Sequence, residues 1–382
     1  RIEPAVGDEL IRKGRIDFIT MGRKLLADPE LPRKLQEGRV NEIRPCVYCY
    51  TCISQIFVNR SVICAVNART GREFETVITP AAEPKHVLVV GGGPAGMETA
   101  RVARLRGHRV TLCEKSSRLG GTVFFSAASY PPNGELVRHL DNEMGRLGVS
   151  VRLGTEVGPD TIRQLAPDVV VAALGAHRGM PTVPGIDLPH VLSGDDIRAM
   201  ITGEGGRGSG SALVDGLMRL GKWAGVLDRP DWMRALSRLW MPLGERVVMV
   251  GGGLVAIELA EFLAERGRQV TVLEEGPVFG AGLKLVRRWR NIADCKRLGV
   301  QFLPEATLVR IEPDSLVYRN AGAQERRIPA DQVIVTSGAE ANPAAVERLR
   351  EAGVPLHAIG DCSGVGYIDG AIHAGFELAM QL

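Results

Sequence analysis

The sequence lacks several features that would assign it to a class at once. No apolar run reaches the roughly 18 residues that a membrane-spanning helix needs, so no membrane partner is expected. The formal net charge is only +3 and no long basic block occurs, which argues against a nucleic-acid partner. The histidines are scattered and indicate no metal site. With 45% hydrophobic and 24% charged residues, the composition is that of a globular chain rather than a disordered one.

Glycine, in contrast, is abundant. It accounts for 46 of 382 residues, well above the usual share of about 7%, and it gathers in the clusters Gly91-Gly92-Gly93 and Gly251-Gly252-Gly253. Each cluster follows a strand pattern, precedes a helix pattern and is followed by a second strand: 86–90, 95–107 and 109–114, then 246–250, 254–267 and 269–274. This duplication predicts an α/β fold with two nucleotide-binding units, each built on a parallel sheet.

The first cluster fits the motif G-x-G-x-x-G through Gly91, Gly93 and Gly96. The first glycine permits the tight turn, the second lets a pyrophosphate approach the backbone, and the third lets helix and strand pack closely. The helix N-terminus then offers N–H groups to the phosphates. Glu114 closes the second strand, where its carboxylate can accept hydrogen bonds from a ribose. The alternative is an ordinary strand-to-helix turn without a cofactor.

The second cluster fits the related motif G-x-G-x-x-A through Gly251, Gly253 and Ala256. Glu274 stands where a carboxylate would bind both hydroxyls of an adenosine ribose, and Glu275 follows it. A 2′-phosphate would meet negative charge there, so the pattern predicts NADH rather than NADPH. A decayed site that keeps the fold but binds no cofactor is the alternative.

The cysteines carry the strongest signal. Four of the seven follow the pattern Cys-x2-Cys-x2-Cys-x11-Cys, namely Cys46, Cys49, Cys52 and Cys64. Three thiolates so close together, with a fourth nearby, can hold one [4Fe-4S] cluster. Structural zinc is the alternative, although it usually takes two separated pairs of cysteines. The odd total and the clustering argue against a disulfide framework, so a reducing cytoplasm is the expected location.

Together these motifs resemble the iron–sulfur flavoenzymes related to old yellow enzyme, a family that includes 2,4-dienoyl-CoA reductase, 2-enoate reductase and trimethylamine dehydrogenase. The resemblance covers the whole chain. It rests on Met21-Gly22-Arg23, Ala27-Asp28-Pro29, the four cysteines, both glycine motifs and Gly360-Asp361. It implies the C-terminal part of such an enzyme, and the start at Arg1 rather than Met also leads us to expect a fragment. A barrel needs about 250 residues, so most of it, with the catalytic residues, is expected to be missing.

The resemblance also implies a domain order. The end of an FMN-binding TIM barrel would cover residues 1–45, where the residue pattern itself predicts helices over 6–13 and 28–38 and a short apolar strand over 16–21. An iron–sulfur segment and linker follow over 46–85. Two Rossmann-like domains of the disulfide-reductase type come next, an FAD domain over 86–195 and 340–382 and an NAD domain over 196–339. The resemblance does not account for residues 203–243, whose own pattern predicts a tryptophan-bearing helical insertion that would either cap the NAD domain or dock a second copy or a partner.

Cofactor residues follow from the same resemblance. Gly22 and Arg23 would hold the FMN phosphate. FAD would be bound by Gly91, Gly93, Ala95, Gly96, Glu114, Arg118, Gly121, Thr122, Val157, Gly360 and Asp361. Among these, Asp361 would contact the flavin ribitol, and a helix over 371–382 would point its N-terminus at the isoalloxazine. The alternative for Asp361 is a simple helix N-cap.

The function implied is an NADH-dependent reductase. Electrons would pass from NADH to FAD, to the [4Fe-4S] cluster, to FMN and finally to an activated C=C bond in a small-molecule substrate of the enoyl-CoA or 2-enoate class. Two alternatives stay open. One is an oxidative N-demethylase of the trimethylamine dehydrogenase type, and the other is an electron-transfer subunit resembling the small subunit of glutamate synthase.

Overall fold

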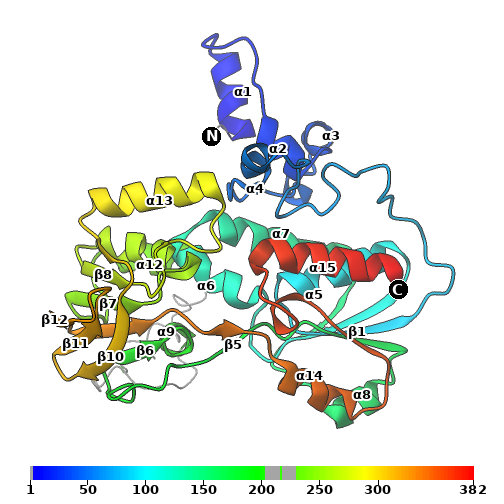
Figure 1. Ribbon diagram of the computed structural model, residues 1–382. Helices are drawn as coiled ribbons and strands as arrows, with labels where there is room; N and C mark the ends of the chain where they lie inside the picture. The colour runs from blue at the N-terminus through cyan, green and yellow to red at the C-terminus, as the bar shows by residue number, and fades with distance from the viewer. Residues whose placement is uncertain (1–2, 203–215, 217–228) are drawn as a thin grey trace.

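The computed structural model describes residues 3–202, 216 and 229–382, and its framework there is two parallel five-stranded sheets (Figure 1). The first sheet has the order β15-β4-β1-β2-β3. Its strands are β1 (His86–Val90), β2 (Arg109–Cys113), β3 (Ser150–Arg152), β4 (Val169–Ala172) and β15 (Leu356–Ala358). Every residue of β1 and β4 is buried, as expected for apolar central strands covered on both faces.

Helices cover the first sheet on both sides. They are α5 (Pro94–Leu105), α6 (Gly121–Ser129), α7 (Pro132–Arg146), α8 (Pro159–Leu165), α14 (Pro343–Arg350) and α15 (Tyr367–Gln381), with η4 (Gly360–Cys362) before the last. Helices α5 and α15 lie side by side (Figure 1). They approach closely because Gly375 faces α5, where an added Cβ would come within 2.6 Å of the Ala95 carbonyl oxygen. This contact fixes the start of α15 near the first glycine turn.

The second sheet has the order β6-β13-β7-β8-β9. Its strands are β6 (Val191–Ser193), β7 (Arg246–Val250), β8 (Gln269–Leu273), β9 (Gln301–Leu303) and β13 (Gln332–Val335). The helices α9 (Gly194–Thr202), α12 (Leu254–Ala264) and α13 (Leu285–Arg297) accompany it, together with an antiparallel sheet of β10 (Thr307–Glu312), β11 (Ser315–Arg319) and β12 (Glu325–Pro329). Both duplicated units therefore form as the sequence pattern predicts.

Two strands join the domains. β5 (His177–Arg178) pairs antiparallel with β14 (Ala339–Glu340), so the two connecting segments run next to each other. Because β6 pairs with β13, residues 191–193 belong to the second sheet, although the sequence assigns residues up to 195 to the first domain. The structural boundary thus lies between β5 and β6.

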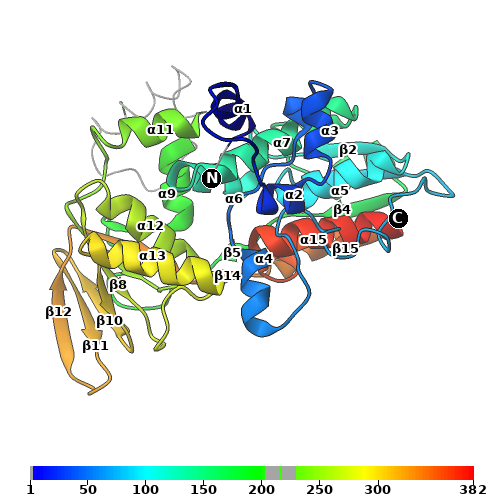
Figure 2. The ribbon, with the colours of Figure 1, turned by 90° about the horizontal axis from the view of Figure 1, so that it is seen from above.

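The N-terminal residues form short helices against the first domain (Figures 1 and 2). They are α1 (Pro4–Arg12), α2 (Gly22–Ala27), α3 (Leu31–Gln36), η1 (Val40–Glu42), α4 (Thr51–Ser54) and η2 (Gln55–Val58). The expected strand over 16–21 is wrong, because the described residues offer no neighbouring strand for it to pair with. Residues 46–85, here called the cysteine segment, share the core of the first domain through Val47, Cys64 and Val66.

Most of the expected insertion, residues 203–215 and 217–228, lies outside the described residues. The described part contains α11 (Pro230–Leu236), which contacts both domains. Arg234 Nη1 donates to the carbonyl oxygens of Ala128 (3.1 Å) and Ser129 (2.8 Å), at the end of α6, while its Nη2 pairs with Glu265 after α12 (3.3 Å). This part of the insertion bridges the two domains rather than capping one of them.

Among the described residues, no helix combines the length and the apolar character needed to cross a membrane.

Candidate functional site

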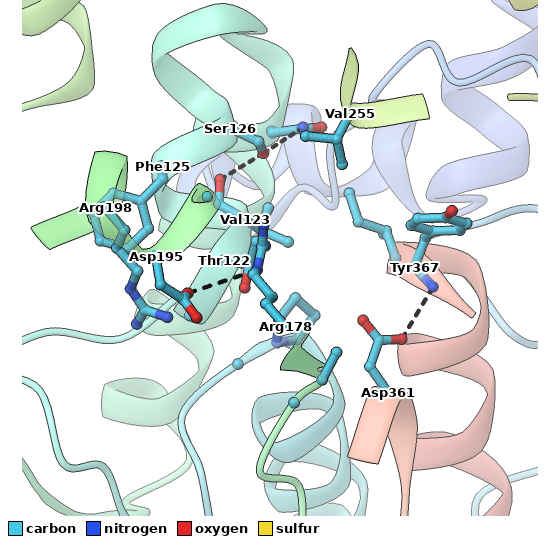
Figure 3. Close-up of a pocket in the computed structure, with 18 of the residues that line it drawn as sticks. Thr122, Val123, Phe125, Ser126, Arg178, Asp195, Arg198, Val255, Asp361 and Tyr367 are labelled. Atoms are coloured by element: carbon cyan, nitrogen blue, oxygen red, sulfur yellow. Dashed lines mark hydrogen bonds and ion pairs between the residues drawn. The ribbon is translucent and has the colours of Figure 1, made fainter. Parts of the chain in front are cut away.

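A cavity of about 1490 Å³ lies between the two domains and exceeds the 300–1,000 Å³ that is usual for small-molecule sites. Figure 3 shows Thr122 and Ser126 of α6, Val255 of α12, Asp361 of η4 and Tyr367 of α15 around this interdomain cavity. Most of the residues assigned to FAD line it: Gly91, Gly93, Ala95, Glu114, Gly121, Thr122, Val157 and Asp361. Three do not: Gly96, Arg118 and Gly360.

The first glycine turn opens toward this cavity. Gly91 has a φ of 110°, and a Cβ there would lie 2.3 Å from the Ala173 carbonyl oxygen, so only glycine fits the turn. A Cβ on Gly96 would lie 2.0 Å from the Gly91 carbonyl oxygen, so this position needs glycine for the contact between α5 and the turn. A Cβ on Gly93 would meet no atom within 4 Å. Gly93 therefore faces open space in front of the N-terminus of α5, where a pyrophosphate can be received.

Glu114 ties the end of β2 to the glycine turn. Its Oε2 accepts a hydrogen bond from Gly92 N (2.7 Å), and its Oε1 accepts from the Ser116 backbone N and hydroxyl (both 2.8 Å). An ionised carboxylate has about four acceptor positions, and these bonds use three of them. The buried Glu114 carboxylate thus keeps capacity for a ribose hydroxyl while holding the turn in place.

Asp361 caps the start of α15. Its Oδ1 accepts from the backbone N of Gly366 (2.9 Å) and of Tyr367 (3.1 Å, Figure 3). The helix therefore begins at Tyr367, and the start expected at residue 371 is wrong by one turn. Asp361 lines the cavity as well as capping the helix, so the two sequence interpretations of this residue are compatible.

Arg118 was assigned to FAD from the sequence, but it does not line the interdomain cavity. Its guanidinium lies 5.0 Å from the centre of the Phe124 ring, outside the residues that line the cavity. In contrast, the sequence pattern did not single out Arg178, Asp195 and Arg198, which do line the cavity (Figure 3). They lie on β5 and α9, short elements without a recognisable motif.

The second glycine turn is more closed than the first. Gly251 has a φ of 96° and Glu274 accepts from Gly252 N (2.6 Å) and Gly276 N (2.9 Å), which repeats the geometry around Glu114. However, Leu254 N, the first N–H of α12, donates to the Ala281 carbonyl oxygen (2.8 Å). Proline occupies the equivalent position in α5 and has no N–H to donate. The four residues assigned to NAD, Gly251, Gly253, Ala256 and Glu274, do not line the interdomain cavity.

The cavity extends to the cysteine segment, since Val47, Cys49 and Ala65 also line it. Tyr130 lines the cavity and also contacts the cysteine segment. Its hydroxyl donates to the Val47 carbonyl oxygen (2.9 Å), and the Arg287 guanidinium stands 3.8 Å from the centre of its ring. Arg287 pairs in turn with Glu258 of α12 (2.9 Å). This contact chain, which the sequence alone does not reveal, links the cysteine segment, the cavity and the second domain.

All four predicted cysteine ligands line one small pocket, here called the cysteine pocket. Burial raises the pKa of the Cys64 thiol to about 12, and burial likewise raises the pKa of Cys46 and of Cys52. Thiolates in such a site need a compensating positive centre, which a bound metal group provides.

No group of three or more His, Cys, Asp or Glu in the described residues is arranged to hold one metal ion. The donor set itself, four cysteines lining one pocket, is the one that a cubane uses, since each cysteine binds one iron. The donor set therefore fits the cluster that the sequence pattern predicts.

A buried ion triad anchors the cysteine segment to α5. Glu98, whose side chain is 1% exposed, accepts from Arg101 Nε (2.8 Å) and Nη2 (2.7 Å) and from Arg44 at 3.4 Å. Arg44 also donates to the Val66 carbonyl oxygen, two residues after Cys64. Burial alone would raise the pKa of Glu98, but the charges of Arg101 and Arg44 overcome this and hold it below its usual value.

A hydrogen bond also joins α15 to the last cysteine. The ring of His373 donates from Nε2 to the Cys64 carbonyl oxygen (2.8 Å). Since α15 starts at the cavity beside Asp361 and reaches the cysteine pocket along its length, one helix positions both sites.

The two neighbouring residues assigned to the FMN phosphate have different surroundings in the structure. Gly22 is exposed at the start of α2, whereas Arg23 lines the cysteine pocket. Its guanidinium lies 5.1 Å from the centre of the Tyr48 ring and 4.6 Å from that of Tyr50.

Fold and site together define a dinucleotide-binding flavoprotein. Residues 85–363 match the family described as pyridine nucleotide-disulphide oxidoreductase, and the chain belongs to this family. Membership implies an FAD site and a NAD(P)H site.

Among curated relatives, a bilirubin reductase from Mediterraneibacter gnavus is 34% identical, with 95% of this chain covered and 51% of the relative. An NADH oxidase from Thermoanaerobacter brockii is 32% identical, and the match covers 100% of this chain and 54% of that relative. An N,N-dimethylglycine/sarcosine dehydrogenase from Chromohalobacter salexigens is 30% identical, covering 91% and 47%. The chain thus spans about half the length of the curated relatives it matches. A solved 2-naphthoyl-CoA reductase complex has a TM-score of 0.85 at 32% identity, covering 100% of this chain and 53% of that one.

Proposed function

We propose that this chain is the electron-transfer part of an NADH-dependent reductase of activated C=C bonds, in which electrons pass from NADH through FAD and a [4Fe-4S] cluster to FMN. One observation carries the proposal. The interdomain cavity is lined both by the first glycine turn and by Val47 and Cys49 of the cysteine segment. A flavin in this cavity would lie next to the cysteine pocket, so electrons would cross a short distance.

The roles of the chain's own residues follow from their contacts. Gly93 and the N-terminus of α5 would receive the pyrophosphate, and Glu114 would accept a hydrogen bond from a ribose hydroxyl. Asp361 and the start of α15 would face the flavin end. Cys46, Cys49, Cys52 and Cys64 would hold the cluster, which supplies one-electron transfer between two-electron partners.

NADH is the proposed electron donor. Glu274 keeps two acceptor positions beyond its bonds to Gly252 and Gly276, and Glu275 adds a second negative charge. A 2′-phosphate would be repelled there. The Ala281 carbonyl at the N-terminus of α12 stands where a pyrophosphate would approach, so binding requires the 280–281 segment to move. The similarity to an NADH oxidase supports the choice of donor.

The proposed substrate class rests on the similar proteins. The names of the bilirubin reductase and the 2-naphthoyl-CoA reductase describe reductions of unsaturated compounds. An enoyl-CoA or 2-enoate would therefore be the electron acceptor, and the residues that touch it would belong to a barrel of which residues 1–45 would form the end.

Anaerobic titration tests the direction of electron flow. NADH is expected to bleach the flavin absorbance of the purified protein near 450 nm, and cinnamate or enoyl-CoA thioesters are expected to restore it in a protein that includes the barrel. Absence of bleaching by NADH would overturn the proposal.

An oxidative N-demethylase is the second candidate, and the similarity to the N,N-dimethylglycine/sarcosine dehydrogenase favours it. In that case electrons would enter from a methylated amine and leave toward an external acceptor. In a protein that includes the barrel, flavin bleaching by dimethylglycine or sarcosine but not by NADH would select this candidate.

A further inference from the structure

Arg23 carries an unexplained feature of the cysteine pocket. Its Nη1 atom is buried, and within the described residues it has no hydrogen-bond partner. The side chain lines the same pocket as the four cysteines. A buried N–H of a charged group without an acceptor is costlier than that of a neutral group, so this arrangement points to an acceptor that belongs in the pocket.

Two tyrosines hold the guanidinium in place. Tyr48 and Tyr50 both have positive φ values, 52° and 64°, in the left-handed region that non-glycine residues rarely adopt. This backbone turns both rings toward Arg23, with its Cζ 5.1 Å and 4.6 Å from their centres. Since both tyrosines alternate with the cysteines in the segment 46–52, the loop that presents the sulfurs also orients the arginine.

Two anionic groups could accept a hydrogen bond from Arg23 Nη1: an FMN phosphate or the sulfur atoms held in the cysteine pocket. An FMN phosphate is the acceptor implied by the family resemblance, but Gly22, which would share it, does not line the cysteine pocket. The cysteine sulfurs, in contrast, line the pocket together with Arg23.

We propose that Arg23 is a positioning residue for the iron–sulfur cluster, donating an N–H to a cluster sulfur and raising its reduction potential. The inference rests on the proposed function, because it assumes that the four cysteines hold a cluster. One-electron reduction adds a negative charge to the cluster, and a fixed positive charge beside it stabilises the reduced form more than the oxidised form. A hydrogen bond to sulfur acts in the same direction.

Redox titration of the protein, followed by low-temperature electron paramagnetic resonance, tests this role. Arg23→Gln removes the charge and is expected to make the cluster at least tenfold harder to reduce, a shift of about 59 mV to more negative potential for a one-electron couple. Arg23→Lys keeps the charge but loses the planar fork, so a smaller shift in the same direction is expected. Lys24→Gln, which removes a neighbouring charge paired with the exposed Glu3, is the control and is expected to leave the potential unchanged.

The outcomes separate the inference from the proposed function. Wild-type protein without iron and sulfide overturns both. Arg23→Gln with full iron content and an unchanged potential overturns only the role of Arg23. Loss of bound FMN from that variant of a protein that includes the barrel, again with an unchanged potential, assigns Arg23 to the phosphate instead. If Arg23→Gln fails to keep its cluster, Arg23→Met, which fills similar space without charge, is titrated, and an unchanged potential there overturns the inference.

Discussion

Replacing Glu98 by glutamine tests how the cysteine segment is fastened to the first domain. Glu98 lies between two guanidinium groups, and the side chains of Arg44 and Arg101 are only 10% and 11% exposed. Glutamine has nearly the same shape but no charge. The substitution leaves two buried positive charges facing each other without the carboxylate that compensates them.

The magnitude follows from the burial. Removing one partner of a buried ion pair costs about 3–5 kcal/mol, because the remaining charge stays desolvated. For domains of this size, that corresponds to a decrease in Tm of roughly 6–20 °C. The exposed pair of Glu135 with Arg138, both more than half exposed, provides the control: Glu135→Gln is expected to cost at most about 0.5 kcal/mol.

The pH dependence has a defined sign. The pKa of Glu98 is lowered in the folded protein, so its contribution is present above its unfolded pKa and is lost as the pH falls through the folded pKa. The difference in the free energy of unfolding between wild type and Glu98→Gln is therefore largest at pH 7. It decreases as the pH falls below 4.5, the ordinary pKa of glutamate. Urea unfolding at pH 7 and at pH 4 measures it. A loss below about 1 kcal/mol at pH 7 would refute the reasoning.

Three further predictions concern the cofactor sites. Gly93→Ala is expected to fold with nearly unchanged Tm but to bind FAD at least tenfold more weakly, whereas Gly96→Ala is expected to lose about 1–3 kcal/mol of stability through its clash with the Gly91 carbonyl; equal effects on Tm would contradict this. Tyr130→Phe is expected to keep FAD but to slow cluster reduction in stopped-flow experiments, while Tyr318→Phe in β11 leaves the rate unchanged; a wild-type rate in Tyr130→Phe would refute the link through Val47. The kcat/KM for NADH is expected to exceed that for NADPH, and Glu274→Gln is expected to bring the NADH/NADPH ratio of kcat/KM closer to one. A wild-type preference for NADPH would refute the assignment of NADH as the electron donor.

The parts of the fold that follow from the sequence are those with strong local signals. The turns at Gly91 and Gly251 need residues that adopt positive φ, and the strands before them are continuous apolar runs, so both units are recognisable without a structure. The segment 16–21 shows the limit of this approach. Its apolar pattern is that of a strand, but a strand exists only with a hydrogen-bonded neighbour, and the described residues contain none beside it.

The contacts that join the sites could not be predicted from the sequence. Arg44 and Glu98 are 54 residues apart, and Tyr130 and Val47 are 83 apart. No spacing rule connects such pairs, because they meet only after the cysteine segment packs against α5 and α6. Arg23 is the clearest example: a motif assigns it to a phosphate, whereas its position in the fold depends on the two tyrosines between the cysteines.

Cofactor analysis of the purified protein tests the central claim most directly. The account predicts a brown protein with four irons and four sulfides per chain, together with one FAD. A colourless preparation, free of iron after anaerobic purification, would contradict it, because the path proposed from the flavin cavity through the cysteine pocket would then have no electron carrier.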